Sequence, residues 1–103
     1  MFLKEEDRQI VDEILNRLAS NLDVFVFGSR ATGEHLKKFS DLDLAFVSKN
    51  GKIESKVISK LKHEFEESDL PIRVDVIDLN AVSENFVSIV KSHYELVRSS
   101  SES

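Results

Sequence analysis

The chain contains no cysteine, no apolar run long enough to cross a membrane, and fewer basic than acidic residues. The absence of cysteine excludes disulfide bonds and thiolate metal sites. A membrane-spanning helix needs roughly 20 consecutive apolar residues, and the sequence has no such run. The net charge of −5 argues against direct nucleic-acid binding, which needs clustered cations. The acidic N-terminal segment lacks the pattern of a signal peptide, so we expect a cytoplasmic protein.

Hydrophobic periodicity along the 103 residues predicts one domain of helices and strands. Helical spacing predicts helices over about residues 5–19, 53–65 and 81–91. Runs rich in valine, phenylalanine and leucine predict strands over residues 22–27, 41–46 and 72–77, with a short terminal strand over 94–97. Residues 29–40 are expected to form a connector with a short helix near its start. We therefore expect an α/β (α+β) domain over residues 1–98, built on a small mixed sheet flanked by helices, and a disordered tail over 99–103.

Three aspartates in the predicted strands are candidate metal ligands. Asp41 and Asp43 lie two residues apart, so on a strand they project from one face about 6–7 Å apart along the chain. Two neighbouring carboxylates repel each other, which is costly unless a cation lies between them. Asp75 lies in a later strand, and if that strand is a neighbour the three carboxylates converge. Such oxygen ligands suit Mg²⁺, and a trio can hold two ions about 3.5–4 Å apart.

A glycine and a serine follow the first predicted strand and form a candidate phosphate-binding turn. Gly28 permits a positive φ and lets a ligand approach the backbone. If a helix begins at Ser29, its N-terminal amides favour a phosphate anion, and Arg30 is a candidate bidentate donor to phosphate. Taken alone, the glycine-serine pair is better explained as a serine-capped turn, and Arg30 as a surface charge. The ordered combination with Asp41, Asp43 and Asp75 carries the functional interpretation.

The stretch Gly-Ser-Arg-Ala-Thr-Gly, followed by Ser-Asp-Leu-Asp-Leu, resembles the minimal nucleotidyltransferase (MNT) branch of the DNA polymerase β-like superfamily. The resemblance implies that Gly28 and Ser29 bind the phosphates of ATP. It implies that Asp41 and Asp43 ligate both of two Mg²⁺ ions, and that Asp75 completes the site where the acceptor hydroxyl is activated. Members of the branch are commonly antitoxins, and active ones transfer AMP from ATP to a helical HEPN-domain toxin.

Three functions remain open from the sequence. The first is an Mg²⁺-dependent enzyme that adds AMP to a HEPN-like helical partner encoded nearby. The second is a catalytically idle antitoxin that acts by binding alone, and the third is the catalytic chain of a two-chain enzyme acting on a small molecule. The intact set of Asp41, Asp43 and Asp75 counts against the second. The nucleotide base, the acceptor atom, self-association and the roles of Arg30, His35 and Tyr94 are left open.

Overall fold

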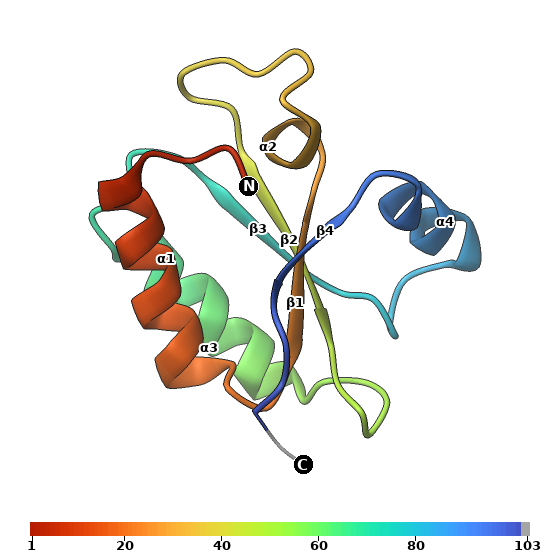
Figure 1. Cartoon of the computed structure of the whole chain (residues 1–103). Helices are drawn as coiled ribbons and strands as arrows, with labels where there is room; N and C mark the ends of the chain where they lie inside the picture. The colour runs from red at the N-terminus through yellow and green to blue at the C-terminus, as the bar shows by residue number, and fades with distance from the viewer. Residues whose placement is uncertain (102–103) are drawn as a thin grey trace.

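The computed structural model describes residues 1–101, in which helices and strands largely alternate along the chain. The helices are α1 (Glu5–Leu18), α2 (Ser29–Thr32), α3 (Ser55–Glu66) and α4 (Glu84–Ser92). The strands are β1 (Asp23–Phe27), β2 (Leu42–Val47), β3 (Val74–Asp78) and β4 (Glu95–Arg98) (Figure 1). The short helix expected near residue 29 and the terminal strand are both present.

The four strands form one mixed sheet in the order β3-β2-β1-β4. β1 pairs antiparallel with β2 and with β4, whereas β2 and β3 run parallel. Parallel neighbours need a crossover connection, and α3 provides it between β2 and β3. The predicted small mixed sheet flanked by helices is confirmed.

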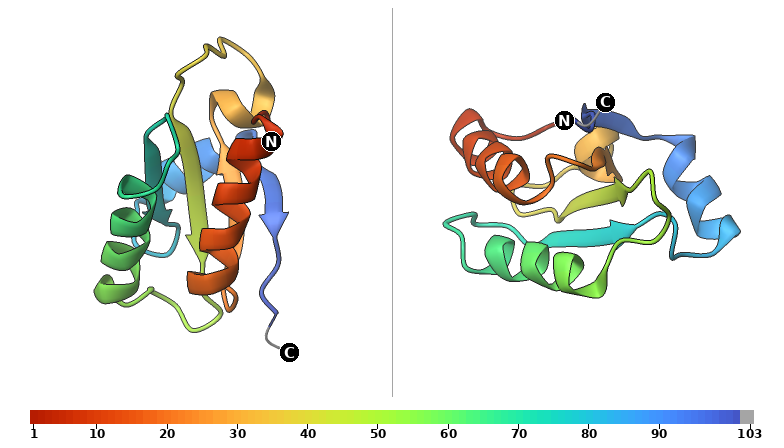
Figure 2. Two further views of the ribbon diagram at one scale, coloured as in Figure 1. Left: turned by 90° about the vertical axis from the view of Figure 1, so that its left-hand side faces the viewer. Right: turned by 90° about the horizontal axis from the view of Figure 1, so that it is seen from below.

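Alternation along the strands separates the two faces of the sheet. Side chains at even positions, among them Val24, Val26, Leu44 and Phe46, pack in the main core, against which residues of α1 and α3 lie. Odd positions such as Ala45 face the other side, where Val90 of α4 packs in a smaller cluster. Figure 2 shows α1 and α3 on one side of the sheet and α4 on the other. Only part of the second face is therefore covered by a helix.

Most predicted boundaries shift by one or two residues, and the start of the last helix shifts by three. The last helix begins at Glu84 instead of residue 81, because the Ser83 side chain accepts a hydrogen bond from the Phe86 amide at 3.2 Å and caps the helix there. The chain after β4 is also held to the domain. The Ser100 amide donates to Asp23 Oδ1 at 2.7 Å, and the Ser101 amide donates to the Ser20 carbonyl at 2.8 Å.

These contacts place Ser100 and Ser101 against the domain, whereas residues 102–103 of the predicted tail lie outside the described part of the chain, so the disordered tail stays a prediction. Within residues 1–101, no helix has the length and apolar character needed to cross a bilayer.

Phe46 is the largest side chain that the main core encloses fully, so its truncation tests how far the sheet depends on this core. We expect Phe46→Ala to lower the free energy of unfolding by about 3–5 kcal/mol, because lost burial and the cavity both contribute. Urea unfolding followed by circular dichroism measures this. The control Ile89→Ala removes a side chain that is 66% exposed and should change stability by less than about 0.5 kcal/mol. Equal losses in the two variants would contradict the assignment of Phe46 to the core.

Candidate active site

Two carboxylates lie side by side on the partly open face of the sheet. Asp43 on β2 is the register partner of Asp75 on β3, so the parallel pairing brings the two side chains together. The pKa of Asp43 is raised to about 6, first by burial, then by a hydrogen bond with Asp75 and by the negative charges of Asp75 and Asp41. The convergence predicted for Asp43 and Asp75 is therefore present, and it places one carboxyl where ionisation is costly.

Asp41 contributes differently from the other two aspartates. It precedes β2 and is exposed, and its charge acts on Asp43 from the loop end of the strand. In residues 1–101, no three His, Cys, Asp or Glu side chains form a ready-made metal-binding group. The structure thus pairs two of the predicted ligands directly and leaves the third as a neighbour. An all-carboxylate donor set in which like charges crowd together still fits a hard cation such as Mg²⁺.

Gly28 is required at its position by both its backbone conformation and its contact with Asp43. Its φ of 71° and ψ of −156° lie in a region that is essentially restricted to glycine. A Cβ atom added to Gly28 would lie 2.5 Å from Asp43 Oδ2, closer than non-bonded atoms approach. The glycine turn and the carboxylate pair therefore form one contiguous surface.

Ser29 begins the single turn of α2 directly after this glycine. The amides of Ala31 and Thr32 both donate to the Gly28 carbonyl, at 3.0 and 3.2 Å, which holds the turn in shape. The first amides of a helix have no partner within the helix. The predicted phosphate-binding turn is thus formed next to the carboxylates, and phosphate binding by Gly28 and Ser29 stays a prediction.

Arg30 is placed differently from the sequence prediction of a phosphate contact. Only 6% exposed, it donates from Nε to the Ser40 carbonyl at 3.0 Å. Its Nη1 donates to the Phe2 carbonyl at 2.9 Å and its Nη2 to the Lys38 carbonyl at 3.3 Å. Because the guanidinium is occupied by three main-chain acceptors, we assign Arg30 to fixing the loop that leads to Asp41. The short-range sequence pattern gave no signal for this role, which depends on a segment 28 residues away.

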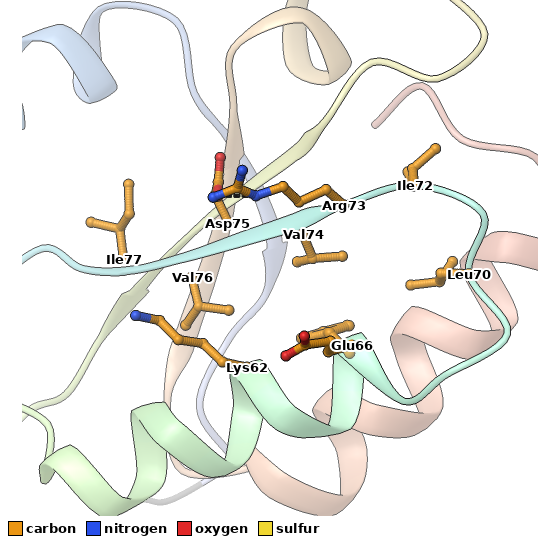
Figure 3. Close-up of a pocket in the computed structure, with 10 residues that line it drawn as sticks. Lys62, Glu66, Leu70, Ile72, Arg73, Val74, Asp75, Val76 and Ile77 are labelled. Carbon is orange, nitrogen blue, oxygen red and sulfur yellow. Dashed lines mark ion pairs between the residues drawn. The ribbon is translucent and has the colours of Figure 1, made fainter.

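Arg73 is a site residue that the motifs did not single out. Its Nε lies 3.3 Å from Asp75 Oδ1, and Figure 3 shows this ion pair on the same side of β3 as Ile77. The i, i+2 spacing of Arg73 and Asp75 on a strand was the available signal. The Arg73 side chain is 77% exposed, whereas Asp75 is half-buried, so Arg73 is free to exchange partners when a charged ligand arrives.

Asp78 and Tyr94 have structural roles. Asp78 accepts hydrogen bonds from the amides of Ile53 and Asn80, at 2.8 and 2.9 Å. Tyr94 stacks on Phe25 with ring centroids 4.7 Å apart, which agrees with a packing role.

Comparison with known proteins identifies the family. A sequence model of the nucleotidyltransferase domain matches residues 8–100. The chain belongs to this nucleotidyltransferase family. It is 41% identical over 96 residues to "Probable protein adenylyltransferase MntA" of Haemophilus influenzae, an alignment that covers 93% of this chain and 82% of the relative.

Solved structures show the same fold. A crystal structure of a toxin–antitoxin with AMP-PNP matches with a TM-score of 0.72 at 20% identity, covering 91% of this chain and 74% of that one. A chain in the structure of a tri-AMPylated Shewanella oneidensis HEPN toxin in complex with MNT antitoxin matches with a TM-score of 0.68 at 17% identity, covering 94% of this chain and 73% of that one. The resemblance to the MNT branch that the motifs indicated is confirmed.

Substitution of Gly28 separates its contact with Asp43 from backbone strain. We expect Gly28→Ala to weaken ATP binding by tenfold or more, because the new Cβ displaces the Asp43 carboxylate. We also expect it to lower stability by about 1–3 kcal/mol, because alanine adopts the backbone conformation at this position poorly. Titration calorimetry with AMP-PNP and urea unfolding measure the two effects. The matched control is Gly51→Ala, since Gly51 also has a positive φ of 94° but has no atom within 4 Å of the added Cβ. Gly51→Ala should lose stability alone, and a similar loss of affinity in both variants would contradict this role.

Asp43 predicts a pH dependence of stability. Its pKa in the folded chain is raised above the ordinary value of 3.8 to about 6, so the folded state binds the proton more tightly than the unfolded state. Its ionisation therefore costs stability, fully above about pH 6 and not at all below 3.8, where both states are protonated. We expect Asp43→Asn to be more stable than wild type by about 1 kcal/mol at pH 7.5, after allowance for solvent screening.

This gain should vanish as the pH is lowered through 6 towards 3.8. Urea unfolding across this range, without divalent ions, measures it. Exposed Asp69 supplies the control Asp69→Asn, which should show no such trend. A gain that grows at acidic pH would show that the sign is wrong.

Proposed function

We propose that this nucleotidyltransferase is Mg²⁺-dependent and transfers AMP from ATP to a hydroxyl of a helical partner protein, as the antitoxin of a HEPN/MNT pair. The observation that carries the proposal is the Asp43–Asp75 pair in register on adjacent strands and in contact with the Gly28 turn. A phosphate-binding turn beside crowded carboxylates is the combination that transfer to or from a nucleoside triphosphate needs. The relative from Haemophilus influenzae, named as a protein adenylyltransferase, supports the choice of reaction.

Asp41, Asp43 and Asp75 are the residues that we assign to holding Mg²⁺. When bound, the two ions proposed would neutralise phosphate charge and the repulsion among the carboxylates. Ser29 and the main chain of Gly28 would bind the phosphates, because they lie on the far side of Asp43 from Asp75. Arg30 supports this arrangement from behind through its three carbonyl contacts.

The carboxylate of Asp75 is the proposed proton acceptor. The acceptor hydroxyl oxygen forms a bond to the α-phosphorus and gives its proton to Asp75, while the bond to the β-phosphate bridging oxygen breaks and pyrophosphate leaves. Asp75 suits this role because it lies on β3, with the pair partner Asp43 between it and the nucleotide turn. Loss of the Arg73 contact to Asp75 would free the carboxylate to take the proton.

The partner assignment rests on the similar structures. Two of them are toxin–antitoxin structures, one with AMP-PNP and one with a tri-AMPylated HEPN toxin. The described residues make one small sheet domain, and we propose that a partner contributes the acceptor. A binding-only antitoxin is the alternative that the following experiment separates.

Replacement of Asp75 tests the proposed function. We expect Asp75→Asn to reduce AMP transfer by about 10²–10⁴-fold, since it removes the proton acceptor, while AMP-PNP affinity changes by much less. The assay uses labelled ATP, Mg²⁺ and the partner that copurifies on expression of the native operon. Asp69→Asn again serves as the control and should transfer at the wild-type rate. Transfer by Asp75→Asn at that rate would remove Asp75 from catalysis, and no transfer by wild type would favour the binding-only antitoxin.

A further inference from the structure

The outer edge of β3 presents main-chain groups that the sheet does not use. The Leu42 amide donates to the Arg73 carbonyl at 2.9 Å, and the Leu79 amide donates to the Phe46 carbonyl at 3.0 Å. A parallel ladder uses every second residue of a strand, so between these bonds Asp75 and Ile77 point their main chain towards β2. The N–H and C=O groups of Val74 and Val76 consequently point away from the sheet.

This edge lacks the protection that the opposite edge of the sheet has. Exposed strand edges pair readily with another chain unless charges or a bulge interrupt them. β4 carries Glu95 and Arg98 at its ends, and its register with β1 shifts between Val24 and Phe25. β3 carries two charged residues: the Asp75 side chain points to the active site, and the Asp78 side chain is buried and accepts the Ile53 and Asn80 amides. β3 therefore remains suited to accept another strand.

A cavity of about 610 Å³ follows the same edge. Figure 3 shows β3 across its top and α3 below, with Val74 and Val76 directed towards α3 and Asp75 directed the other way. Lys62 and Glu66 of α3 line it and offer one charge of each sign. The edge thus combines free main-chain partners, an apolar floor and polar groups, which an extended peptide can use together.

The register of the sheet connects this edge to the proposed chemistry. Phe27, which precedes the Gly28 turn, pairs with Asp43, and Asp43 pairs with Asp75. A residue on a strand added beside β3 would be next in this row, about 4.8 Å from Asp75 along the row and with its side chain on the same face. The nucleotide turn would then lie at one end of the row and the acceptor at the other, which suits in-line attack.

We propose that an extended segment of the acceptor protein pairs with Val74 and Val76 as an added edge strand and presents its hydroxyl beside Asp75. This inference rests on the proposed function and specifies the substrate as an extended segment of that helical partner, selected first by main-chain hydrogen bonds. In the transfer, the hydroxyl of that segment loses its proton to Asp75 and bonds to the α-phosphorus as pyrophosphate leaves. Residues of the segment on either side of the hydroxyl lie over the cavity beside Lys62 and Glu66.

A proline tests the edge without removing a ladder bond. Val74→Pro deletes an amide that points outward, a position where edge strands tolerate proline. The matched variant Val74→Ala also loses the valine side chain but keeps the amide. The probe is the partner that copurifies from the native operon, with labelled ATP and Mg²⁺. We expect Val74→Pro to raise the KM for the partner about tenfold above that of Val74→Ala, with equal AMP-PNP affinity in the two variants.

Amide exchange followed by NMR gives a second measurement on the wild-type chain. The amides of Val74 and Val76 should exchange quickly in the free chain and slowly in the complex with the partner.

Equal KM values for the two variants, or unchanged exchange at both amides while transfer proceeds, would overturn the inference and leave the proposed function intact. Protection that grows with the concentration of this chain alone would assign the edge to a second copy and also overturn it. A wild-type chain that labels no partner would reject the proposed function and, with it, this inference.

Discussion

The placement of Asp43 is the constraint on which the candidate site depends. Its carboxylate occupies the space that a side chain at Gly28 would need, and on the other side it shares a hydrogen bond with Asp75. Both contacts follow from strand register, because β2 lies between β1 and β3 in the sheet. The arrangement raises the pKa of Asp43, so the site is maintained at a cost in stability that a bound cation would relieve. A site that opposes folding in this way indicates selection for chemistry.

The parts of the site that are local in sequence were predictable, and the parts that depend on distant segments were not. Alternation along residues 41–46 and 72–77 predicted which side chains share a face, and Gly28 predicted the turn after the first strand. Whether Asp75 would meet Asp43 required the strand order and the register, which periodicity does not determine. Arg30 illustrates the second kind most clearly. Its charge suggested a phosphate ligand, but a main-chain carbonyl near the N-terminus, far away in sequence, accepts its hydrogen bond.

Buried polar groups hold both ends of β2. Arg30 fixes the loop before the strand through the Lys38 and Ser40 carbonyls. At the other end, Asp78 accepts the Ile53 amide and ties the start of the crossover to β3. Buried charges need such partners, and each interaction here links segments far apart in the chain. β2 is thus held in register between its neighbours, which keeps Asp43 opposite Asp75.

β4 follows the other three strands in the sequence, and this order has a consequence for folding. Phe25 pairs with Leu96, whereas β1, β2 and β3 are contributed by residues 23–78. Closing the long loop between β1 and β4 costs more entropy than forming the earlier pairs, and chains emerge from the ribosome at roughly 5–20 residues per second. The row that carries Asp43 and Asp75 can therefore assemble before β4 joins the sheet. Until β4 arrives, the free edge of β1 is open to nascent-chain chaperones or to mispairing with another polypeptide.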